Sequence, residues 1–359
     1  MDYLKARERH LLFVLGKGFD PRMCLGLRTL LGAGGSGKRD VLAIDLREGE
    51  SSPSRALAPM VDANWTDLEN VGGKTALSTK PIDMRSAEGR AIGSRRAAGI
   101  FRNGRDLMGY TDVVIDVSAL PRSIYFPLIA KVLNILDQAP EAEFKLLPNV
   151  HVLVAENPEV DRRIRDEGVE DTAVYVYPFS ARVDMESTAE YPKIWLPLLG
   201  EAQEAQLERI YDLVKPDEIS PVLPSPSVNP RRGDDLVYEY RYLLFDRLRV
   251  EARDLIYASE WNPFEVYRRL LRAIIRYREA LMPLGGCKAV ISALSTKLTS
   301  IGALLAAYEL RQLKEQSLDV GVAHVESQGY AISQADRKAL PLASTKLFEL
   351  WLRGECYES

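Results

Sequence analysis

The chain has 359 residues, of which 46% are hydrophobic, with 47 basic side chains against 51 acidic ones and a formal net charge of −4. That hydrophobic content can bury a substantial core, and ordinary domain sizes predict two medium domains. A slightly acidic chain is not a general nucleic-acid coat, so any phosphate-binding surface has to be local.

Short apolar runs alternate with helical patterns from the first residues onward. Most lack the polar alternation of half-exposed strands and leave room for crossover helices, which predicts an α/β fold with mostly parallel sheets flanked by helices. The first run is strand-sized and too short for a signal peptide or a membrane span, so we expect a soluble chain with no membrane partner. The predicted strands are residues 11–16, 40–46, 112–118, 149–155, 173–179, 218–224, 254–258, 288–294 and 319–325.

Helix starts follow several of these strands. Asp20, Asn157, Asn229 and Asn262 each precede a proline, which places a good N-cap residue before a proline at the first helical position. Glu265 stands at the capping-box distance from Asn262. The repeated order of strand, cap and helix supports the α/β prediction.

A polar, proline-containing segment at about 180–197 interrupts the alternation. It predicts a boundary between two Rossmann-like units, an N-terminal domain at 1–185 and a C-terminal domain at 198–359. The pentapeptide Ala-Leu-Ser-Thr-Lys occurs at both 76–80 and 293–297. This repeat is either the trace of a duplication or a coincidence, because no other part of the two halves lines up.

The glycine-rich stretch LGAGGSGKRD at 31–40 approaches the Walker pattern of phosphate-binding loops. A Walker loop follows a buried strand and opens a helix, whereas this stretch follows a predicted helix and precedes a predicted strand. Arg39 also stands where a serine or threonine would hold magnesium. We therefore interpret the glycines as a helix cap at Gly32 and a loop after it.

A second glycine turn is better placed for a ligand. Gly16 and Gly18 follow the first predicted strand directly, and Asp45 ends the next one. In open α/β sheets, ligands occupy the crevice at this end of the strands, and an acid at the second strand can hydrogen-bond a ribose hydroxyl. These residues predict a nucleotide-type ligand. In the alternative interpretation, the glycines only shape a turn and Asp45 simply ends its strand.

Arginine follows proline at three predicted helix starts, at Arg22, Arg122 and Arg231–Arg232. The helix dipole disfavours a cation there, so three such arginines indicate an anion site beside free helical N–H groups. We include Asp20, Arg22 and Arg122 in the candidate site. The alternative is that the arginines face solvent or pair with neighbouring carboxylates such as Asp20 or Asp234.

Ser295, Thr296 and Lys297 lie between a predicted strand and an Ala/Leu-rich helix, within residues 288–310. Hydroxyls, backbone N–H groups and one ammonium thus gather at the carboxyl end of a strand. This element resembles the ligand-contacting element of the CRISPR-associated Rossmann fold (CARF) and SAVED sensor domains, and residues 114–134 are similar to another unit of that group. The resemblance implies that the three residues contact a cyclic oligonucleotide signal in prokaryotic antiviral defence.

A competing resemblance concerns the first glycine turn. The pattern Gly16-x-Gly18-x-Asp20-x-Arg22, followed by Asp45, is similar to the cofactor turn of S-adenosylmethionine methyltransferases of the leucine carboxyl methyltransferase type. This resemblance implies a cofactor enzyme that depends on Asp45.

Five arginines, Arg90, Arg95, Arg96, Arg102 and Arg105, follow one another with no acidic residue between the first and the last. They can engage the phosphates of a nucleic acid or nucleotide. On one helix they would occupy more than one face, so we favour a solvated or interface helix.

The three cysteines are widely spaced with no Cys-x-x-Cys pair, which indicates a reducing compartment, and we expect a cytoplasmic protein. The three histidines show no metal-ligand spacing with them, so we expect no metal site. We expect a nucleotide- or phosphorylated-ligand-binding sensor or complex subunit of a prokaryotic defence system, with a protein partner or a homo-oligomer as its assembly. A nucleic-acid partner is not favoured. The alternatives are an S-adenosylmethionine-dependent methyltransferase or other nucleotide-dependent transferase, and a non-catalytic scaffold.

Overall fold

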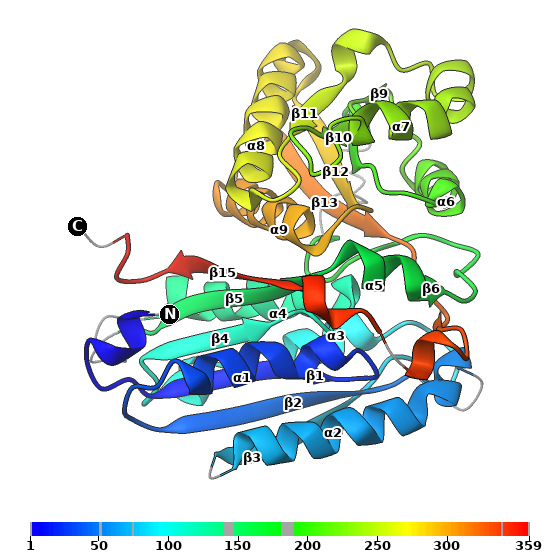
Figure 1. Cartoon of the computed structure of the whole chain (residues 1–359). Coiled ribbons are helices and arrows are strands. Elements are labelled where there is room, and N and C mark those ends of the chain that lie inside the picture. The colour runs from blue at the N-terminus through cyan, green and yellow to red at the C-terminus, as the bar shows by residue number, and fades with distance from the viewer. Residues whose placement is uncertain are drawn as a thin grey trace. The chain divides into compact units, whose positions relative to one another are not determined.

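The computed structural model describes residues 2–49, 52–73, 75–139, 147–180, 190–338 and 340–357. The chain divides into two compact units (Figure 1). The first unit comprises Met1–Gly168 together with Ser327–Ser359, and the second comprises Val169–Glu326.

The first unit is built on a six-stranded sheet with the order β15-β5-β4-β1-β2-β3. All neighbouring pairs are parallel except β15 and β5, which are antiparallel. The central strands are buried along nearly their whole length, as expected for continuous apolar runs. The strands are β1 (Leu11–Lys17), β2 (Arg39–Arg47), β3 (Ala76–Asp83), β4 (Asp112–Asp116), β5 (Asn149–Glu156) and β15 (Lys346–Arg353), and β6 (Arg165–Asp166) and β14 (Tyr330–Ala331) form a small separate pair.

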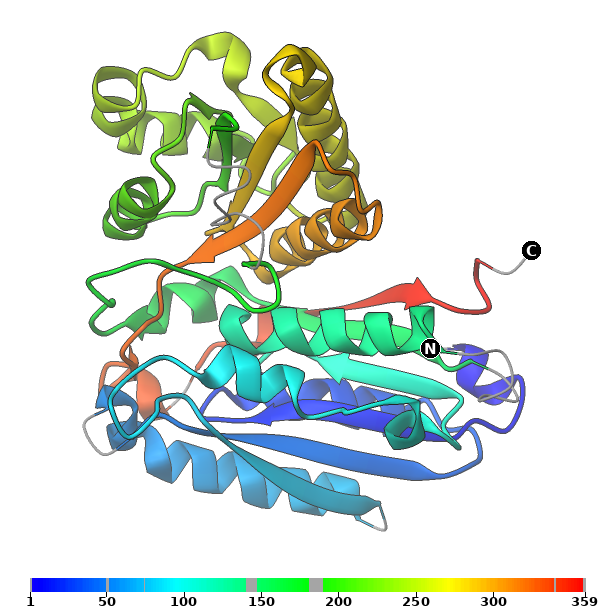
Figure 2. The same cartoon turned by 180° about the vertical axis from the view of Figure 1, so that it is seen from behind.

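Helices cover both faces of this sheet. Figures 1 and 2 show α1 and α2 on one face and α3 and α4 on the other. On the α1 side, the core contains Phe13 and Leu15 of β1 packed with Met23, Leu27 and Leu30. The helices are α1 (Leu25–Gly32), α2 (Ala58–Gly72), α3 (Gly93–Ala98), α4 (Arg122–Asp137) and α5 (Pro158–Arg163), with 3-10 helices η2 (Pro21–Cys24), η3 (Pro53–Leu57) and η4 (Gly104–Leu107).

The second unit repeats this arrangement. Its sheet has the order β11-β10-β8-β12-β13-β7, with β9 beside β8 and only β7 antiparallel. Figure 1 shows α8 and α9 on one side of the sheet and α6 and α7 on the other. The elements are β7 (Val174–Tyr175), β8 (Lys193–Leu198), α6 (Glu204–Val214), β9 (Glu218–Ile219), β10 (Val222–Pro224), α7 (Arg232–Glu239), a π-helix (Tyr242–Arg247), β11 (Ile256–Ala258), α8 (Pro263–Ala280), β12 (Cys287–Ala293), α9 (Lys297–Gln312) and β13 (Leu318–His324).

Both units are therefore Rossmann-like. In each, the main parallel strands lie in the order third, second, first, fourth, fifth along the chain, and an antiparallel strand closes the edge beside the fifth. The repeated pentapeptide does not follow this symmetry. Residues 76–80 lie in β3, a third strand, whereas 293–297 end β12, a fourth strand, and begin α9. The shared pentapeptide is thus a coincidence, although the two topologies match.

All nine predicted strand regions contain a strand, but β3, β8, β15 and the two-residue strands β6 and β14 were not predicted. The sequence of β3 is largely polar, and prolines in and beside β8 made that segment look like part of a linker. The boundary also differs from the expected one, because the first unit ends at residue 168 and takes back residues 327–359. Residues 181–189 of the expected boundary lie outside the described residues.

Local helix signals were mostly correct. Asn157 and Asn262 are N-caps whose side chains accept backbone N–H groups, and Asp20 caps η2 in the same way. Asn229 is not a cap, because α7 begins at Arg232. The glycine-rich loop does connect α1 to β2, but its left-handed residues are Gly34, Gly35 and Gly37 rather than Gly32.

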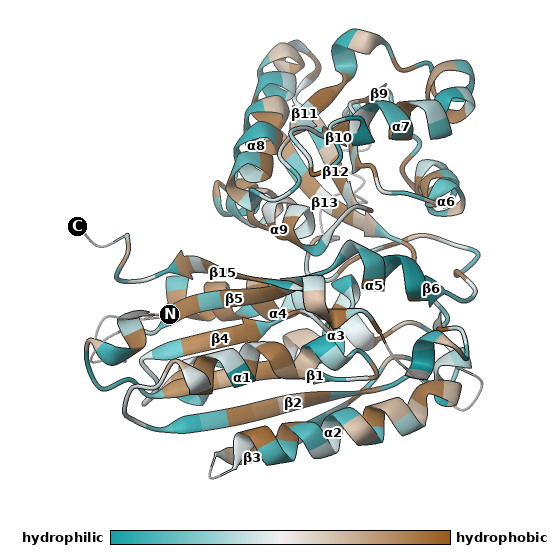
Figure 3. Ribbon diagram, viewed as in Figure 1, coloured by the Kyte–Doolittle hydropathy of each residue, from teal (hydrophilic) through white to brown (hydrophobic). Residues whose placement is uncertain are grey.

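Hydropathy follows this architecture. In Figure 3 the central strands of both sheets are mostly brown, and the helices carry apolar and polar residues in alternation. Across the described ranges, every helix is too short or too polar to cross a bilayer.

Candidate ligand sites at the carboxyl edges of the sheets

Each sheet has a point where the strand order reverses, and in open α/β folds ligands bind outside the carboxyl ends of the strands at that point. It lies between β1 and β4 in the first unit and between β8 and β12 in the second. The nine predicted site residues lie at or just after the carboxyl ends of strands, but they divide between the two units. The first unit holds Gly16, Gly18, Asp20, Arg22, Asp45 and Arg122, and the second holds Ser295, Thr296 and Lys297.

Gly16 does not leave room for a ligand. A Cβ atom at this position would lie 2.7 Å from Cδ2 of Leu120 and 3.0 Å from the carbonyl oxygen of Ala119. The chain's own loop between β4 and α4 therefore approaches the glycine, which corrects the prediction of a close ligand at Gly16. Gly18 is less crowded, since the nearest atoms to its would-be Cβ belong to Ala119 at 3.8 Å.

Arg22 is committed to carboxylates. Its side chain is 3% exposed, and its guanidinium bonds both oxygens of Asp20 at 2.7–3.0 Å and Asp161 at 2.8 Å. It also donates to the carbonyl of Ala155 at 3.3 Å. Burial by itself would lower the pKa of Arg22, but the two carboxylates outweigh it and raise that pKa. The anion site predicted at Arg22 is thus replaced by the alternative interpretation, pairing with Asp20.

Three other polar groups remain at this edge of the first unit. Asp45 lies beside Lys17 in the register of β1 and β2, and no described residue forms a hydrogen bond or ion pair with its side chain. The Lys17 ammonium lies 4.8 Å from the centre of the Trp65 ring. Arg122, the first residue of α4, is partly exposed.

The second unit presents Ser295, Thr296 and Lys297 between β12 and the 16-residue helix α9. Thr296 is the N-cap, and its side chain accepts the backbone N–H of Thr299 at 3.4 Å. All three predicted residues are partly exposed, whereas β12 before them is buried throughout. Hydroxyls, an ammonium and the positive end of a helix dipole therefore meet at one point of the edge, which suits an anion.

The loop that carries these residues is held against the end of β8. A Cβ on Gly200 would lie 2.1 Å from the carbonyl oxygen of Leu294 and 3.1 Å from Cα of Ser295. Gly200 lies just after the first strand of its sheet, and Gly16 is the next-to-last residue of the first strand in the other unit. Each unit thus uses a glycine to pack the loop after the fourth strand across the end of the first.

Three charged residues of the second unit, Arg232, Glu201 and Glu260, were not predicted to contact one another. Arg232 forms ion pairs with Glu260 at 2.7 Å and with Glu201 at 3.6 Å. Glu201 comes directly after Gly200, the residue that packs against Leu294 and Ser295. The prolyl-arginine pattern had singled out Arg232, but it suggested Asp234 as partner, whereas the actual partners follow the carboxyl ends of β8 and β11.

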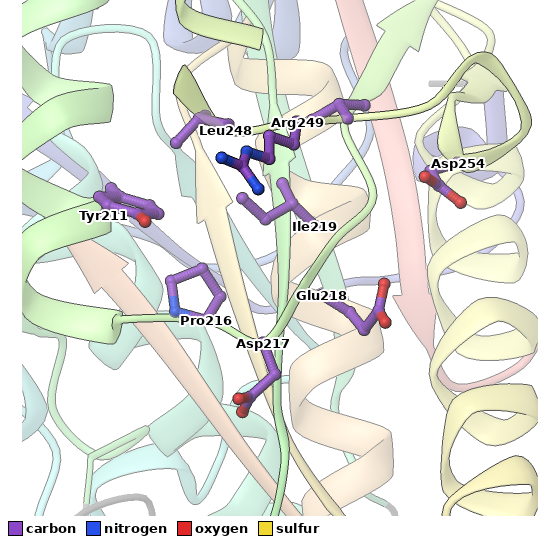
Figure 4. Close-up of a pocket in the computed structure, with 9 residues that line it drawn as sticks. Tyr211, Pro216, Asp217, Glu218, Ile219, Leu248, Arg249 and Asp254 are labelled. Carbon is purple, nitrogen blue, oxygen red and sulfur yellow. The ribbon is translucent and has the colours of Figure 1, made fainter. Parts of the chain in front are cut away.

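A pocket of about 210 Å³ lies elsewhere in the second unit (Figure 4). Its lining includes Pro216, Asp217 and Glu218 ahead of or within β9, and Arg249 and Asp254 ahead of β11. It therefore opens at the amino ends of strands, away from the predicted edge. Its volume is below the roughly 300–1,000 Å³ of most small-molecule sites.

The first unit also contains a buried ionic cluster, at the amino ends of β4 and β5. Arg9 donates to Asp112 at 2.9 Å, and Asp112 also accepts from His151 at 3.2 Å and from Asn149 at 2.9 Å. Burial would raise the pKa of Asp112, but hydrogen bonds from His151, Thr111 and Asn149 lower it to about 2. Because this cluster lies at the edge opposite the switch point, we assign it a structural role.

No protein-family model matches the chain, and no curated protein matches it in sequence. Among solved structures, it is similar to a Type III CRISPR defence DNA nuclease activated by cyclic oligoadenylate, at 10% identity and a TM-score of 0.47, covering 82% of this chain and 63% of the other. It is also similar to the cytoplasmic domain of a prokaryotic cation chloride cotransporter, at 11% identity and a TM-score of 0.21, covering 90% and 96%. A universal stress protein from Archaeoglobus fulgidus DSM 4304 aligns at 9% identity and a TM-score of 0.25, covering 89% and 97%.

The first of these proteins is a CRISPR defence nuclease that cyclic oligoadenylate activates. The present chain spans 63% of the length of that nuclease chain. Similarity of this size assigns no ligand and no activity.

Proposed function

We propose that the chain is a cytoplasmic sensor or complex subunit that binds a nucleotide or another phosphorylated small molecule at the carboxyl edge of its second sheet. The observation that carries the proposal is the position of Ser295, Thr296 and Lys297. They are partly exposed, begin a 16-residue helix and lie at the switch point of a Rossmann-like sheet. A phosphate there would meet helical N–H groups, hydroxyls and an ammonium at once.

Arg232 is a second cation of the same unit, and its side chain is 17% exposed, whereas that of Arg22 is 3% exposed. Two carboxylates, Glu201 and Glu260, orient its guanidinium, and Glu201 directly follows Gly200, which packs against the Ser295 backbone. A guanidinium held in place loses little side-chain entropy when it binds a second partner. A cyclic oligonucleotide is the first ligand class to test, because of the resemblance to CARF and SAVED domains, and the role in antiviral defence is proposed on that resemblance alone.

The first experiment is a thermal-shift screen of the purified protein against cyclic oligoadenylates, ATP, NAD and S-adenosylmethionine. A ligand at about 100 times its dissociation constant stabilises the folded protein by about 2.7 kcal/mol, which a melting curve resolves. Stabilisation by cyclic oligonucleotides or ATP would support the sensor. A flat response to all four classes would leave the scaffold as the better description.

The residue test uses Lys297→Gln, with Lys215→Gln as the matched control. Lys215 is an exposed lysine of the same unit, at the C-cap of α6. Loss of a charge-assisted hydrogen bond of about 1.5–3 kcal/mol weakens binding roughly 10- to 100-fold. If Lys297→Gln binds the ligand found in the screen as tightly as the wild type, Lys297 does not contribute to the site and the proposal is refuted at its principal residue.

The methyltransferase remains the second candidate because of Asp45. Its carboxylate lies at the carboxyl end of β2, and within the described ranges its side chain has no hydrogen-bond or ion-pair partner. If S-adenosylmethionine binds, Asp45→Asn should weaken that binding at least tenfold, the value of one lost hydrogen bond to a charged group. If this variant binds S-adenosylmethionine as tightly as the wild type, the hypothesis that Asp45 holds this cofactor is wrong.

A further inference from the structure

Five exposed arginines lie close together in the sequence of the first unit, in a segment that the proposed ligand site does not use. We call the set Arg90, Arg95, Arg96, Arg102 and Arg105 the arginine surface. Each of these residues is exposed. Within the described part of the chain, no hydrogen bond, ion pair or ring contact involves any of the five guanidinium groups.

These arginines do not lie on one helix. After β3, Arg90 lies in a turn closed by the bridge between Arg85 and Ala91, Arg95 and Arg96 lie in α3, Arg102 lies just before the N-cap of η4, and Arg105 lies in η4. In α3, Ala97 and Ala98 are buried while Arg95 and Arg96 are exposed. Figure 2 shows this segment, in cyan, in front of the sheet on the face that also carries α4.

The backbone that presents the arginines is held in place. Asn103 caps η4 in a capping box, in which Asp106 accepts the backbone N–H groups of Arg102 and Asn103 at 2.6 and 3.4 Å. The Asp106 carboxylate thus serves the backbone and is not paired with a guanidinium. Lys80 donates to the carbonyl of Ile100 at 2.8 Å and fixes the connection after α3.

The charge of the segment indicates the chemistry of its partner. Residues 85–105 contain six arginines and one acidic residue, Glu88, in a chain whose net charge is −4. The five exposed arginines of the arginine surface suit a polymer of phosphates, since each phosphate contact releases a condensed counterion.

The segment has no apolar anchor of the kind that a protein partner requires. The buried centres of protein interfaces depend on aromatic and other large apolar side chains. Among the described residues of 85–105, none is an exposed large hydrophobic residue, and the nearest one along the chain is Met108. The same lack of exposed aromatic rings argues against single strands, whose bases stack on such rings.

We propose that the arginine surface binds the phosphate backbone of a nucleic-acid duplex without regard to sequence. This contact is separate from the ligand site, which lies in the other unit. It gives the protein a second kind of partner, recognised by charge alone.

The test is fluorescence anisotropy with labelled 20-base-pair duplexes of DNA and of RNA at sodium chloride concentrations from 50 to 200 mM. Five phosphate contacts predict a slope of about −4.5 in a plot of log K against log salt, which is roughly 500-fold weaker binding across that range. The triple variant R95Q/R96Q/R105Q should reduce the slope by about three and weaken binding at least tenfold at 50 mM salt.

The matched control is R268Q/R272Q/R276Q on α8. These three arginines are also exposed, and their side chains form no contact with described residues, so the change in net charge is the same. The control variant should bind the duplex like the wild type. Equal weakening by both variants would reduce the effect to net charge and overturn the proposal, as would the absence of wild-type binding at 50 mM salt.

Two further comparisons separate the outcomes. Competition by polyglutamate as strong as by duplex DNA would point to an acidic protein partner and refute the proposal. Lys297→Gln should bind the duplex normally, so a failure of the proposed ligand site and a failure of the arginine surface are distinguishable. Unchanged melting temperatures of both triple variants verify that the exposed substitutions leave the fold intact.

Discussion

His151 offers a sharp test of how the first unit is stabilised. The side chain is fully buried in β5, with Nε2 3.2 Å from Asp112 and Nδ1 3.2 Å from Glu349 of β15. Carboxylate oxygens only accept, so both ring nitrogens donate and the imidazole carries a positive charge. Burial by itself would lower the pKa of His151, but hydrogen bonds to the two carboxylates raise it above the ordinary value.

Replacement of His151 by glutamine removes the imidazolium between the two carboxylates, although Arg9 still pairs with Asp112 and the Tyr3 hydroxyl still donates to Glu349. Breaking a buried ion pair by removing one partner costs about 3–5 kcal/mol. The Glu349 side chain is 22% exposed, so water offsets part of the loss. We therefore expect His151→Gln to lower the free energy of unfolding by about 3 kcal/mol. For a unit of roughly 200 residues, this corresponds to a melting temperature lower by about 6–12 °C.

The direction of the pKa shift determines how the stabilisation by His151 changes with pH. Because the folded-state pKa lies above the unfolded value of about 6.5, the contribution of the charged ring is fully present below about pH 6.5. It is lost as the pH rises through the folded-state pKa. We therefore expect the difference in the free energy of unfolding between wild type and His151→Gln, measured by urea unfolding from pH 6 to 9, to be largest at pH 6. The difference should become smaller as the pH rises.

His10→Gln is the control, because His10 is only partly buried and accepts a backbone N–H from Lys38 at Nδ1. At pH 6 it should lower the free energy of unfolding much less than His151→Gln does. A gap for His151→Gln that stays constant from pH 6 to 9 would refute the reasoning that a buried imidazolium bridges the two carboxylates.

Three further predictions concern packing and capping. Gly302→Ala should lower the free energy of unfolding of the second unit by about 1–3 kcal/mol, because the new Cβ would lie 2.4 Å from the carbonyl oxygen of Pro263. This clash should outweigh the higher helix propensity of alanine. A higher urea midpoint for the variant would contradict the prediction. Ser292→Ala should lower the free energy of unfolding by about 1–3 kcal/mol, because the buried indole N–H of Trp195 donates to Ser292 at 3.0 Å. The same substitution should cost less in a Trp195→Phe background, where no indole N–H is left unpaired. Asn157→Ala should cost about 1–2 kcal/mol in urea unfolding, because its side chain caps α5 by accepting two backbone N–H groups, and a cost near zero would disprove the cap.

Much of the secondary structure could be predicted because its causes are local. Asn157 and Asn262 accept N–H groups two or three residues away, so a short sequence window contains both partners. The strands at 112–116 and 287–293 are mostly apolar and lack the regular polar alternation of half-exposed strands, and both are buried throughout. The same local order placed the glycine-rich loop between a helix and a strand and excluded a Walker loop.

Site residues were harder to assign, because their roles depend on partners that are distant in the chain. Arg22 was identified as unusual, but its partner Asp161 and the carbonyl of Ala155 come from beyond β5 and from β5 itself. Arg232 was noticed as well, yet nothing near it in sequence pointed to Glu260.

By itself, then, the sequence determined the fold class, most strands, the helix caps and the presence of polar groups at the carboxyl ends of strands. Only the tertiary structure decided which loop fills the space above Gly16, that β15 returns to pair with β5, and that the predicted site divides between two units. The physical reason is that periodicity and capping involve neighbours along the chain. Strand order and close packing are instead set by the burial of all the apolar faces at once.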